Sequence, residues 1–199
     1  MVGQTRAQSK KEVCVGGIDP SLRFTGVCIL PPTGEHILHL VSFPKYRGAK
    51  RLLAIREEVV SILEVYNISL VAFEGYSYNS VGKWFDLGEV GGVLKVELAI
   101  RNIETLVVPP ASLKKFVTNN GQADKDRMVR EVNAHYLFSL AEPVTNDNLT
   151  DAVGLAHFAR VADTGDSSRR CELEAVKNLY EGSTKKKKKK TYKKFWAAI

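Results

Sequence analysis

Two carboxylates end apolar runs of the kind that form buried strands. Asp19 follows residues 13–18, and Glu74 follows residues 69–73. A third acid, Asp151, stands alone in the otherwise apolar helical stretch 148–156. Because a buried carboxylate is costly unless something binds it, three acids in such surroundings indicate a metal site. Oxygen-only ligands suit Mg²⁺ or Mn²⁺, since hard cations prefer carboxylates and keep several waters.

Each of these acids also has a structural interpretation. A bare Asp or Glu at the end of a strand often caps a helix or closes a turn and binds no ligand. The recurrence of the pattern three times in one short chain favours the metal site. The counts of three cysteines and four histidines give no competing zinc site.

Composition predicts one domain with charged ends. The chain has 199 residues, 44% of them apolar, which is enough for a single core. We expect a flexible N-terminus over residues 1–11, a domain over 12–163 and a basic, partly disordered extension over 164–199. The net charge of +7 resides in the extension, because residues 168–199 carry 11 basic and 3 acidic side chains. The unbroken lysines 185–190 indicate either a solvated tail or a nonspecific phosphate-binding arm.

Cysteine usage indicates the cellular compartment. Cys14, Cys28 and Cys171 are odd in number, and the first two lie in apolar strand-like runs, so we expect reduced thiols. Residues 1–11 lack the apolar core of a signal peptide, and no run reaches the roughly 18 apolar residues of a membrane span. We therefore expect an intracellular protein, cytoplasmic or nucleoid-associated, with no membrane partner.

Hydrophobic periodicity predicts an α/β domain. Three strands joined by short links favour an antiparallel meander, and the later alternation of helices and strands favours parallel pairing. The predicted strands are 13–18, 25–30, 37–43, 69–74 and 105–108. The predicted helices are 51–65, 81–100, 111–117, 125–140 and 147–162.

Local motifs sharpen this layout. They are, in chain order, Gly17-Ile18-Asp19-Pro20-Ser21 with Thr25-Gly26, Phe73-Glu74, Val108-Pro109-Pro110, Lys114-Lys115, Gly121-Gln122-Ala123-Asp124-Lys125 and Thr150-Asp151-Ala152-Val153-Gly154-Leu155-Ala156. In order and spacing they resemble the RuvC-type Holliday-junction resolvases over about residues 12–163. The resemblance implies a ribonuclease H-like fold. Such a fold has a mixed five-stranded sheet, antiparallel in the first three strands and then parallel, flanked by helices.

The resemblance also implies an activity. The expected enzyme is a structure-specific endodeoxyribonuclease that resolves four-way (Holliday) junctions, and other branched DNA, by paired nicks. Catalytic Asp19, Glu74 and Asp151 would bind two Mg²⁺ or Mn²⁺ ions per active site. Two-metal hydrolysis gives a 5′-phosphate and a 3′-hydroxyl.

One position departs from the family pattern. The fourth acid of the family lies three residues before the last one, where this chain has Asn148. Asn148 and Asp147 both share a helix face with Asp151, so either could reach the metals. Asp147 could instead be a helix N-cap, and Asn148 could be an inactivating change.

Further residues are assigned to DNA by the resemblance. Lys114, Lys115 and Lys125 match basic positions near the scissile DNA, although a solvated surface also explains them. Tyr76 and Tyr78 lie near the position of an aromatic that can stack on a base, or could pack on the sheet edge. The helix at 81–100 matches one that forms a homodimer, which would nick a junction symmetrically.

Three alternatives remain open at this point. A ribonuclease H-type or flap nuclease would use the same metals on another substrate. A noncatalytic junction-binding protein would follow if Asn148 disabled the metal site. An actin-like ATPase shares the Gly-Ile-Asp and Thr-Gly pattern, but this chain is too short for the second phosphate loop that such a protein requires.

Overall fold

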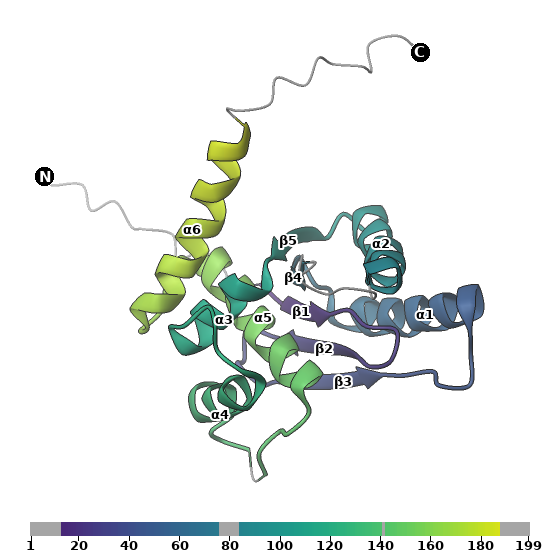
Figure 1. Ribbon diagram of the computed structural model, residues 1–199, viewed down its shortest axis with the longest axis horizontal. Helices are drawn as coiled ribbons and strands as arrows, with labels where there is room; N and C mark the ends of the chain where they lie inside the picture. Colours follow the sequence, from purple (N-terminus) through teal and green to yellow (C-terminus); the bar gives the residue numbers. More distant parts are fainter. Residues whose placement is uncertain (1–12, 76–83, 141, 188–199) are drawn as a thin grey trace, which may run out of the picture.

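A five-stranded sheet forms the centre of the protein (Figure 1). The computed structural model describes residues 13–75, 84–140 and 142–187. The strand order is β3-β2-β1-β4-β5; β1, β2 and β3 pair antiparallel, whereas β4 and β5 run parallel to β1. The predicted mixed sheet is therefore confirmed. The strands are β1 (Val15–Asp19), β2 (Thr25–Leu30), β3 (Ile37–Val41), β4 (Leu70–Glu74) and β5 (Glu104–Val108).

Helices cover both faces of the sheet (Figure 1). One apolar core lies between the sheet and α1 and α2, and the other lies between the sheet and α3 to α6. Because side chains alternate along a strand, Val15, Gly17 and Asp19 share the second of these faces. The helices are α1 (Gly48–Tyr66), α2 (Trp84–Ile100), α3 (Pro110–Thr118), α4 (Lys125–His135), α5 (Asp147–Thr164) and α6 (Arg170–Lys187). None of the described helices is both long and apolar enough to cross a membrane.

Most element boundaries differ from the prediction by one to five residues, and two of the differences have a clear structural cause. The helix predicted over 125–140 ends at His135, because the next two residues turn into the core. Tyr136 and Leu137 are buried there, and the Leu137 amide donates to the carbonyl of Val132. The strand predicted to reach Phe43 ends at Val41, where its pairing with Thr25 of β2 stops.

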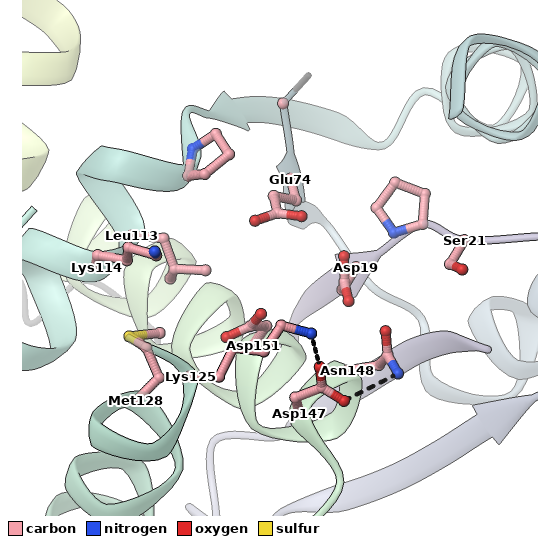
Figure 2. A pocket seen from close by; sticks show the side chains of 13 residues that line it. Asp19, Ser21, Glu74, Leu113, Lys114, Lys125, Met128, Asp147, Asn148 and Asp151 are labelled. Atoms are coloured by element: carbon pink, nitrogen blue, oxygen red, sulfur yellow. Dashed lines mark hydrogen bonds and ion pairs between the residues drawn. The ribbon is translucent and has the colours of Figure 1, made fainter. Parts of the chain in front are cut away.

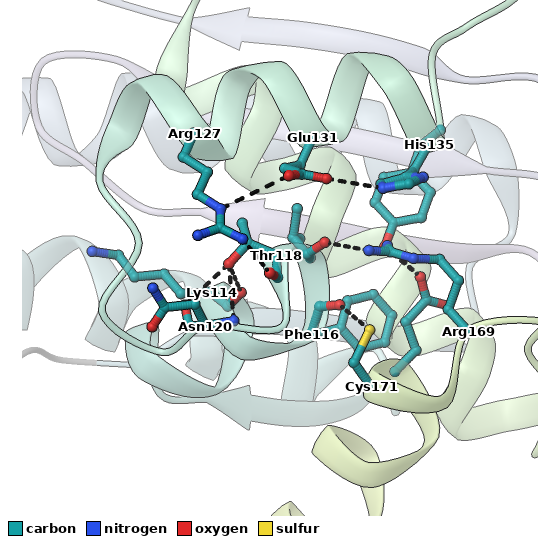
Figure 3. Close-up of polar contacts among 12 residues, drawn as sticks. Lys114, Phe116, Thr118, Asn120, Arg127, Glu131, His135, Arg169 and Cys171 are labelled. Atoms are coloured by element: carbon teal, nitrogen blue, oxygen red, sulfur yellow. Dashed lines mark hydrogen bonds and ion pairs between the residues drawn. The ribbon is translucent and has the colours of Figure 1, made fainter.

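The C-terminal extension contributes a helix that the sequence analysis did not predict. Arg169, labelled in Figure 3, lies directly before α6 and connects it to α3. Its guanidinium donates to the Val117 carbonyl of α3 at 2.6 Å and to Glu172 of α6 at 2.8 Å. Ala175 and Val176 are buried in the shared core. Charged residues dominate the sequence of the extension, so the short apolar face of α6 was not recognised in its pattern. Most of the lysine-rich segment that follows lies outside the described residues.

His157 of α5 is a packing residue. Its ring stacks on Tyr136 with the centroids 4.1 Å apart, and its Nε2 lies 2.7 Å from Nε2 of His36. The Tyr136 hydroxyl donates in turn to Glu172 of α6 at 2.6 Å. This chain of contacts therefore ties α5 to the extension, away from the three acids.

Helix α5 lies directly on β1 and β2 because two glycines leave room for it. A Cβ on Gly17 would stand 2.1 Å from the carbonyl oxygen of Ala152 and 2.3 Å from the nitrogen of Ala156. A Cβ on Gly26 would stand 2.1 Å from the carbonyl oxygen of Asn148. These obstacles are helix backbone, which cannot give way as a flexible side chain can. The two glycines thus set the distance between α5 and the strand that carries Asp19.

We expect Gly17→Ala to lower the free energy of unfolding by about 3 kcal/mol or more, because overpacking against backbone displaces the helix. Urea denaturation measures this loss. The matched control is Gly16→Ala, whose Cβ would meet a Val71 methyl group at 3.3 Å on the opposite face. The control should lose less than about 1 kcal/mol. Equal losses in the two variants would contradict the close packing of α5.

Candidate active site

Three acids from three elements point into one space (Figure 2). Ile18 of β1 pairs with Phe73 of β4, so Asp19 and Glu74 end two neighbouring parallel strands side by side. Both side chains lie on the face that α5 covers, and Asp151 extends toward them from that helix. The convergence that the sequence predicts is therefore present in the fold.

The acids line a cavity of about 420 Å³. Lys114 of α3 and Lys125 of α4 line it from the side opposite the β1 strand end, and Asp147 and Asn148 line it from the first turn of α5. The sequence analysis did not assign several other lining residues to the site. They are Pro20, Ser21, Gly75, Pro110, Leu113 and Met128. Pro20, Ser21 and Pro110 occur in the motifs quoted above, and this was the only sequence signal that could have assigned them to the site.

Burial and mutual repulsion raise the pKa of the acids. Asp19 is 7% exposed, and burial, followed by the charge of Glu74, raises its pKa well above the usual range. Burial and the charges of Glu74 and Asp147 raise the pKa of Asp151 to about 7. Burial also raises the pKa of Glu74, against the opposing effects of a hydrogen bond with Asp19 and of the nearby lysines. The cluster is thus short of positive charge, which a cation would supply.

Asp147 is engaged by a lysine and does not cap its helix. Its carboxylate pairs with Lys125, and this hydrogen bond lowers the pKa of Asp147 and raises that of Lys125. The N-cap is Asn146, whose side-chain oxygen accepts from the Leu149 amide at 3.2 Å. The alternative interpretation of Asp147 as the N-cap is therefore wrong.

Asn148 presents its amide oxygen to the cavity. Its Nδ2 donates backward to Asn146 Oδ1 at 3.4 Å and to Asp147 Oδ1 at 3.5 Å. Figure 2 shows the remaining Oδ1 turned toward Asp19. An uncharged oxygen therefore occupies the position at which the family pattern has an acid.

Not every predicted residue reaches this cavity. Lys115 is half-buried on α3 and does not line it, and Tyr76 and Tyr78 lie outside the described residues. Within the described ranges, no three Asp, Glu, His or Cys side chains stand in a ready-made metal-binding arrangement. The carboxylates would therefore rotate to share a cation.

Comparison with known proteins assigns the family. The family model for the crossover junction endodeoxyribonuclease RuvC matches residues 15–158. The chain belongs to the RuvC family. The RuvC endonuclease of Thermotoga maritima is 30% identical over 146 residues, which cover 70% of this chain and 86% of the relative. The RuvC endonuclease of Mycolicibacterium vanbaalenii is 28% identical over 185 residues, covering 88% of this chain and 94% of that protein.

A solved RuvC structure confirms the ribonuclease H-like fold. RuvC of Thermus thermophilus in complex with a Holliday junction substrate superposes with a TM-score of 0.65. The match covers 77% of this chain and 97% of that one, at 22% identity. The described sheet and helices therefore follow the RuvC architecture.

We expect Asp151→Asn to raise the melting temperature by about 2–4 °C in a chelator, the shift that about 1 kcal/mol produces in a chain of this size. The reason is that the amide removes one of several repelling carboxylates. Added Mn²⁺ should stabilise the original chain and have less effect on the variant, since a ligand that binds the folded state raises its stability. Differential scanning fluorimetry measures both shifts.

The control for this measurement is Asp166→Asn, which makes the same chemical change at an exposed residue just after α5. It should melt like the original chain in both conditions. A gain in the control as large as in Asp151→Asn would show that the acids of the cavity do not repel one another in the folded protein.

Proposed function

We propose that this protein cuts four-way DNA junctions by metal-dependent hydrolysis, with Asp19, Glu74 and Asp151 as the catalytic carboxylates. The RuvC family consists of crossover junction endodeoxyribonucleases, and it is a family of metal-dependent nucleases. The observation that supports the proposal most directly is the convergence of three partly buried acids at one cavity. Crowding of these carboxylates costs stability, and a bound cation would neutralise their mutual repulsion.

The donors in the cavity fit a hard cation. They are carboxylate oxygens and one amide oxygen, the ligand types that Mg²⁺ and Mn²⁺ prefer. When bound, two such ions would lower the pKa of the attacking water and stabilise the leaving 3′ oxygen, giving a 5′-phosphate and a 3′-hydroxyl. The protein's own part is to hold Asp19 and Glu74 on rigid strand ends, and Asp151 on a helix fixed against them.

Asn148 completes the ligand set in this proposal, and Asp147 has a different task. Because Asp147 already pairs with Lys125, it positions that lysine beside the acids. Asn148 keeps its amide oxygen free for a metal by donating its Nδ2 to neighbouring residues. The site then carries three carboxylate charges near the metals and a fourth in an ion pair.

Two lysines suit contact with the DNA backbone. Lys114 and Lys125 line the cavity and lower the pKa of Glu74 and Asp151 by their charges. A phosphate entering the cavity would meet both ammonium groups, and such contacts position the DNA without reading its sequence. Two copies of the chain, related by a twofold axis, would place two such cavities on one junction for paired nicks.

We expect Asp19→Asn, Glu74→Gln and Asp151→Asn each to reduce cleavage of a synthetic four-way junction at least about a thousandfold. Each change removes a charged ligand and keeps the shape of the side chain, so junction binding should remain within about threefold. Gel assays with Mg²⁺ or Mn²⁺ measure cutting, and fluorescence anisotropy in Ca²⁺ measures binding. Flap DNA, linear duplex and an RNA–DNA hybrid serve as competing substrates. Full cleavage by any one variant would remove that residue from the site.

We expect Asn148→Asp to lower the Mg²⁺ concentration for half-maximal cleavage by about tenfold, because a fourth free carboxylate binds the cation more tightly. The control is Asn146→Asp, which adds the same charge two residues earlier, where an acid still caps the helix. That control should leave the Mg²⁺ requirement within about twofold. If only Asn148→Asp cleaved, the chain would instead be a noncatalytic junction-binding protein, and the proposed hydrolysis would be wrong.

A further inference from the structure

A second hollow adjoins the acidic cavity. It has a volume of about 570 Å³, and three arginines line it: Arg23, Arg47 and Arg51. The turn after β1 separates the two spaces, because Ser21 lines the acidic cavity and Leu22, the next residue, lines the hollow. Both spaces therefore lie at the sheet end where β1 and β3 stop (Figure 1).

The three arginines have no acidic partner among the described residues. The guanidinium of Arg47 donates to the carbonyl of Tyr46 at 2.9 Å and also to that of Pro44. Arg51 Nε donates to the same Tyr46 carbonyl at 2.7 Å. A carbonyl orients a guanidinium but leaves its charge in place. By contrast, Arg56, one turn further along α1, is neutralised by Glu97 at 2.7 Å.

The surrounding sequence adds to this positive charge. No acid occurs between Glu35 and Glu57, whereas the same stretch includes Lys45 and Lys50, both exposed. The body of the chain is nearly neutral, with 18 basic and 19 acidic residues over positions 1–167. A group of cations with no acidic partner in the described part of the chain, set in a nearly neutral body, is thus a local feature that suits a polyanion.

The turn that carries Arg23 is held firmly beside Asp19. The Ser21 hydroxyl accepts from the Arg23 amide at 3.2 Å, and the Thr25 hydroxyl donates to the Ser21 carbonyl at 2.7 Å. The Ser42 hydroxyl, at the end of β3, donates to the Arg23 carbonyl at 2.8 Å. The backbone at Arg23 therefore has a fixed position relative to the acids, as a binding surface requires.

We propose that Arg23, Arg47 and Arg51 bind backbone phosphates of the DNA strand that is cut, next to the scissile phosphate. This inference rests on the proposed function and extends it by stating where the cut DNA strand runs after it leaves the acidic cavity. Phosphates recur about every 3.4 Å of helix rise on one strand, so a strand leaving the acidic cavity over the turn brings its next phosphates to the hollow. Phe24, 38% exposed at its wall, offers an apolar contact to a sugar.

The test is the double variant Arg47→Gln/Arg51→Gln, measured for junction binding in Ca²⁺ over a range of salt. We expect affinity to fall about tenfold or more, and the plot of log Kd against log salt to flatten by about one per arginine. The matched control, Arg170→Gln/Lys177→Gln, removes two exposed charges from α6 and should leave the slope unchanged. An equal effect in the control would overturn the proposal.

Two further measurements test whether the loss of binding comes from the arginines that line the hollow. Arg23→Gln changes a side chain outside the loop hydrogen bonds, and it should flatten the slope by about one even if the double variant proves unstable. Single methylphosphonate groups within three nucleotides of the cut should weaken binding by the original chain at one or more positions. At those positions they should have no further effect on the arginine variant. Additive losses at every position would refute the contact.

The two proposals fail in distinguishable ways. If the original chain cuts no junction in any divalent cation, the proposed function is wrong, whatever the binding data give. If it cuts junctions but the arginine variants keep the original affinity and salt slope, only the path of the strand is wrong.

Discussion

The contact between α5 and the sheet is the constraint on which the site depends. Repulsion among Asp19, Glu74 and Asp151 drives the helix away from the strands, whereas burial of its apolar face holds it there. Val153, Leu155 and Phe158 of α5 are all fully buried in the core that the helix shares with the sheet and the neighbouring helices. Each such side chain contributes on the order of 1.5–3 kcal/mol on burial, so packing outweighs the crowding of the acids. The fold can therefore sustain an arrangement that electrostatics alone would disperse.

The helix is also held at its far end. The guanidinium of Arg160 donates to the carbonyl of Val13 at 2.7 Å and to that of Leu30 at 2.8 Å, at the ends of β1 and β2. The close approach at Gly17 and Gly26 fixes the near end. Both ends of the helix are thus held against the same two strands, which gives the backbone at Asp151 a defined position relative to the strand that carries Asp19. A shared metal requires such a backbone, since its ligands must reach a narrow range of positions when their side chains rotate.

The elements that could be predicted from the sequence are those that depend on the pattern of neighbouring residues. The bounds of β2 were predicted without error, and the apolar runs of β1 and β4 correctly placed the two strand-end acids. The motif order supplied the relation to Asp151, which no periodicity contains. What escaped prediction depends on tertiary contacts. Tyr136 ends α4 by turning into the core, and α6 forms because Arg169 finds the carbonyl of Val117 on a neighbouring helix.

The roles of some residues near the site could not be predicted for a similar reason. Asn146 and Asp147 are adjacent polar residues, and only the fold shows that the first caps the helix and the second pairs with Lys125. Arg47 and Arg51 occur in a sequence that reads as the start of an ordinary amphipathic helix. Among the described residues they have no carboxylate partner, whereas Arg56 has one, and this difference depends on the surface that α1 presents and not on its periodicity.

Basic side chains around the acidic cavity offset the repulsion between its carboxylates and a phosphodiester. A phosphodiester is anionic, and a cavity lined by carboxylates repels it before any cation is bound. Lys114 and Lys125 flank the acids on the α3 and α4 side, and the arginines of the hollow flank them across the turn after β1. In the proposed site, cations on both sides would attract the backbone on either side of the scissile phosphate, so that the repulsion would act on one phosphate and the attraction on several. A nearly neutral domain would in this way hold a polyanion over an acidic centre.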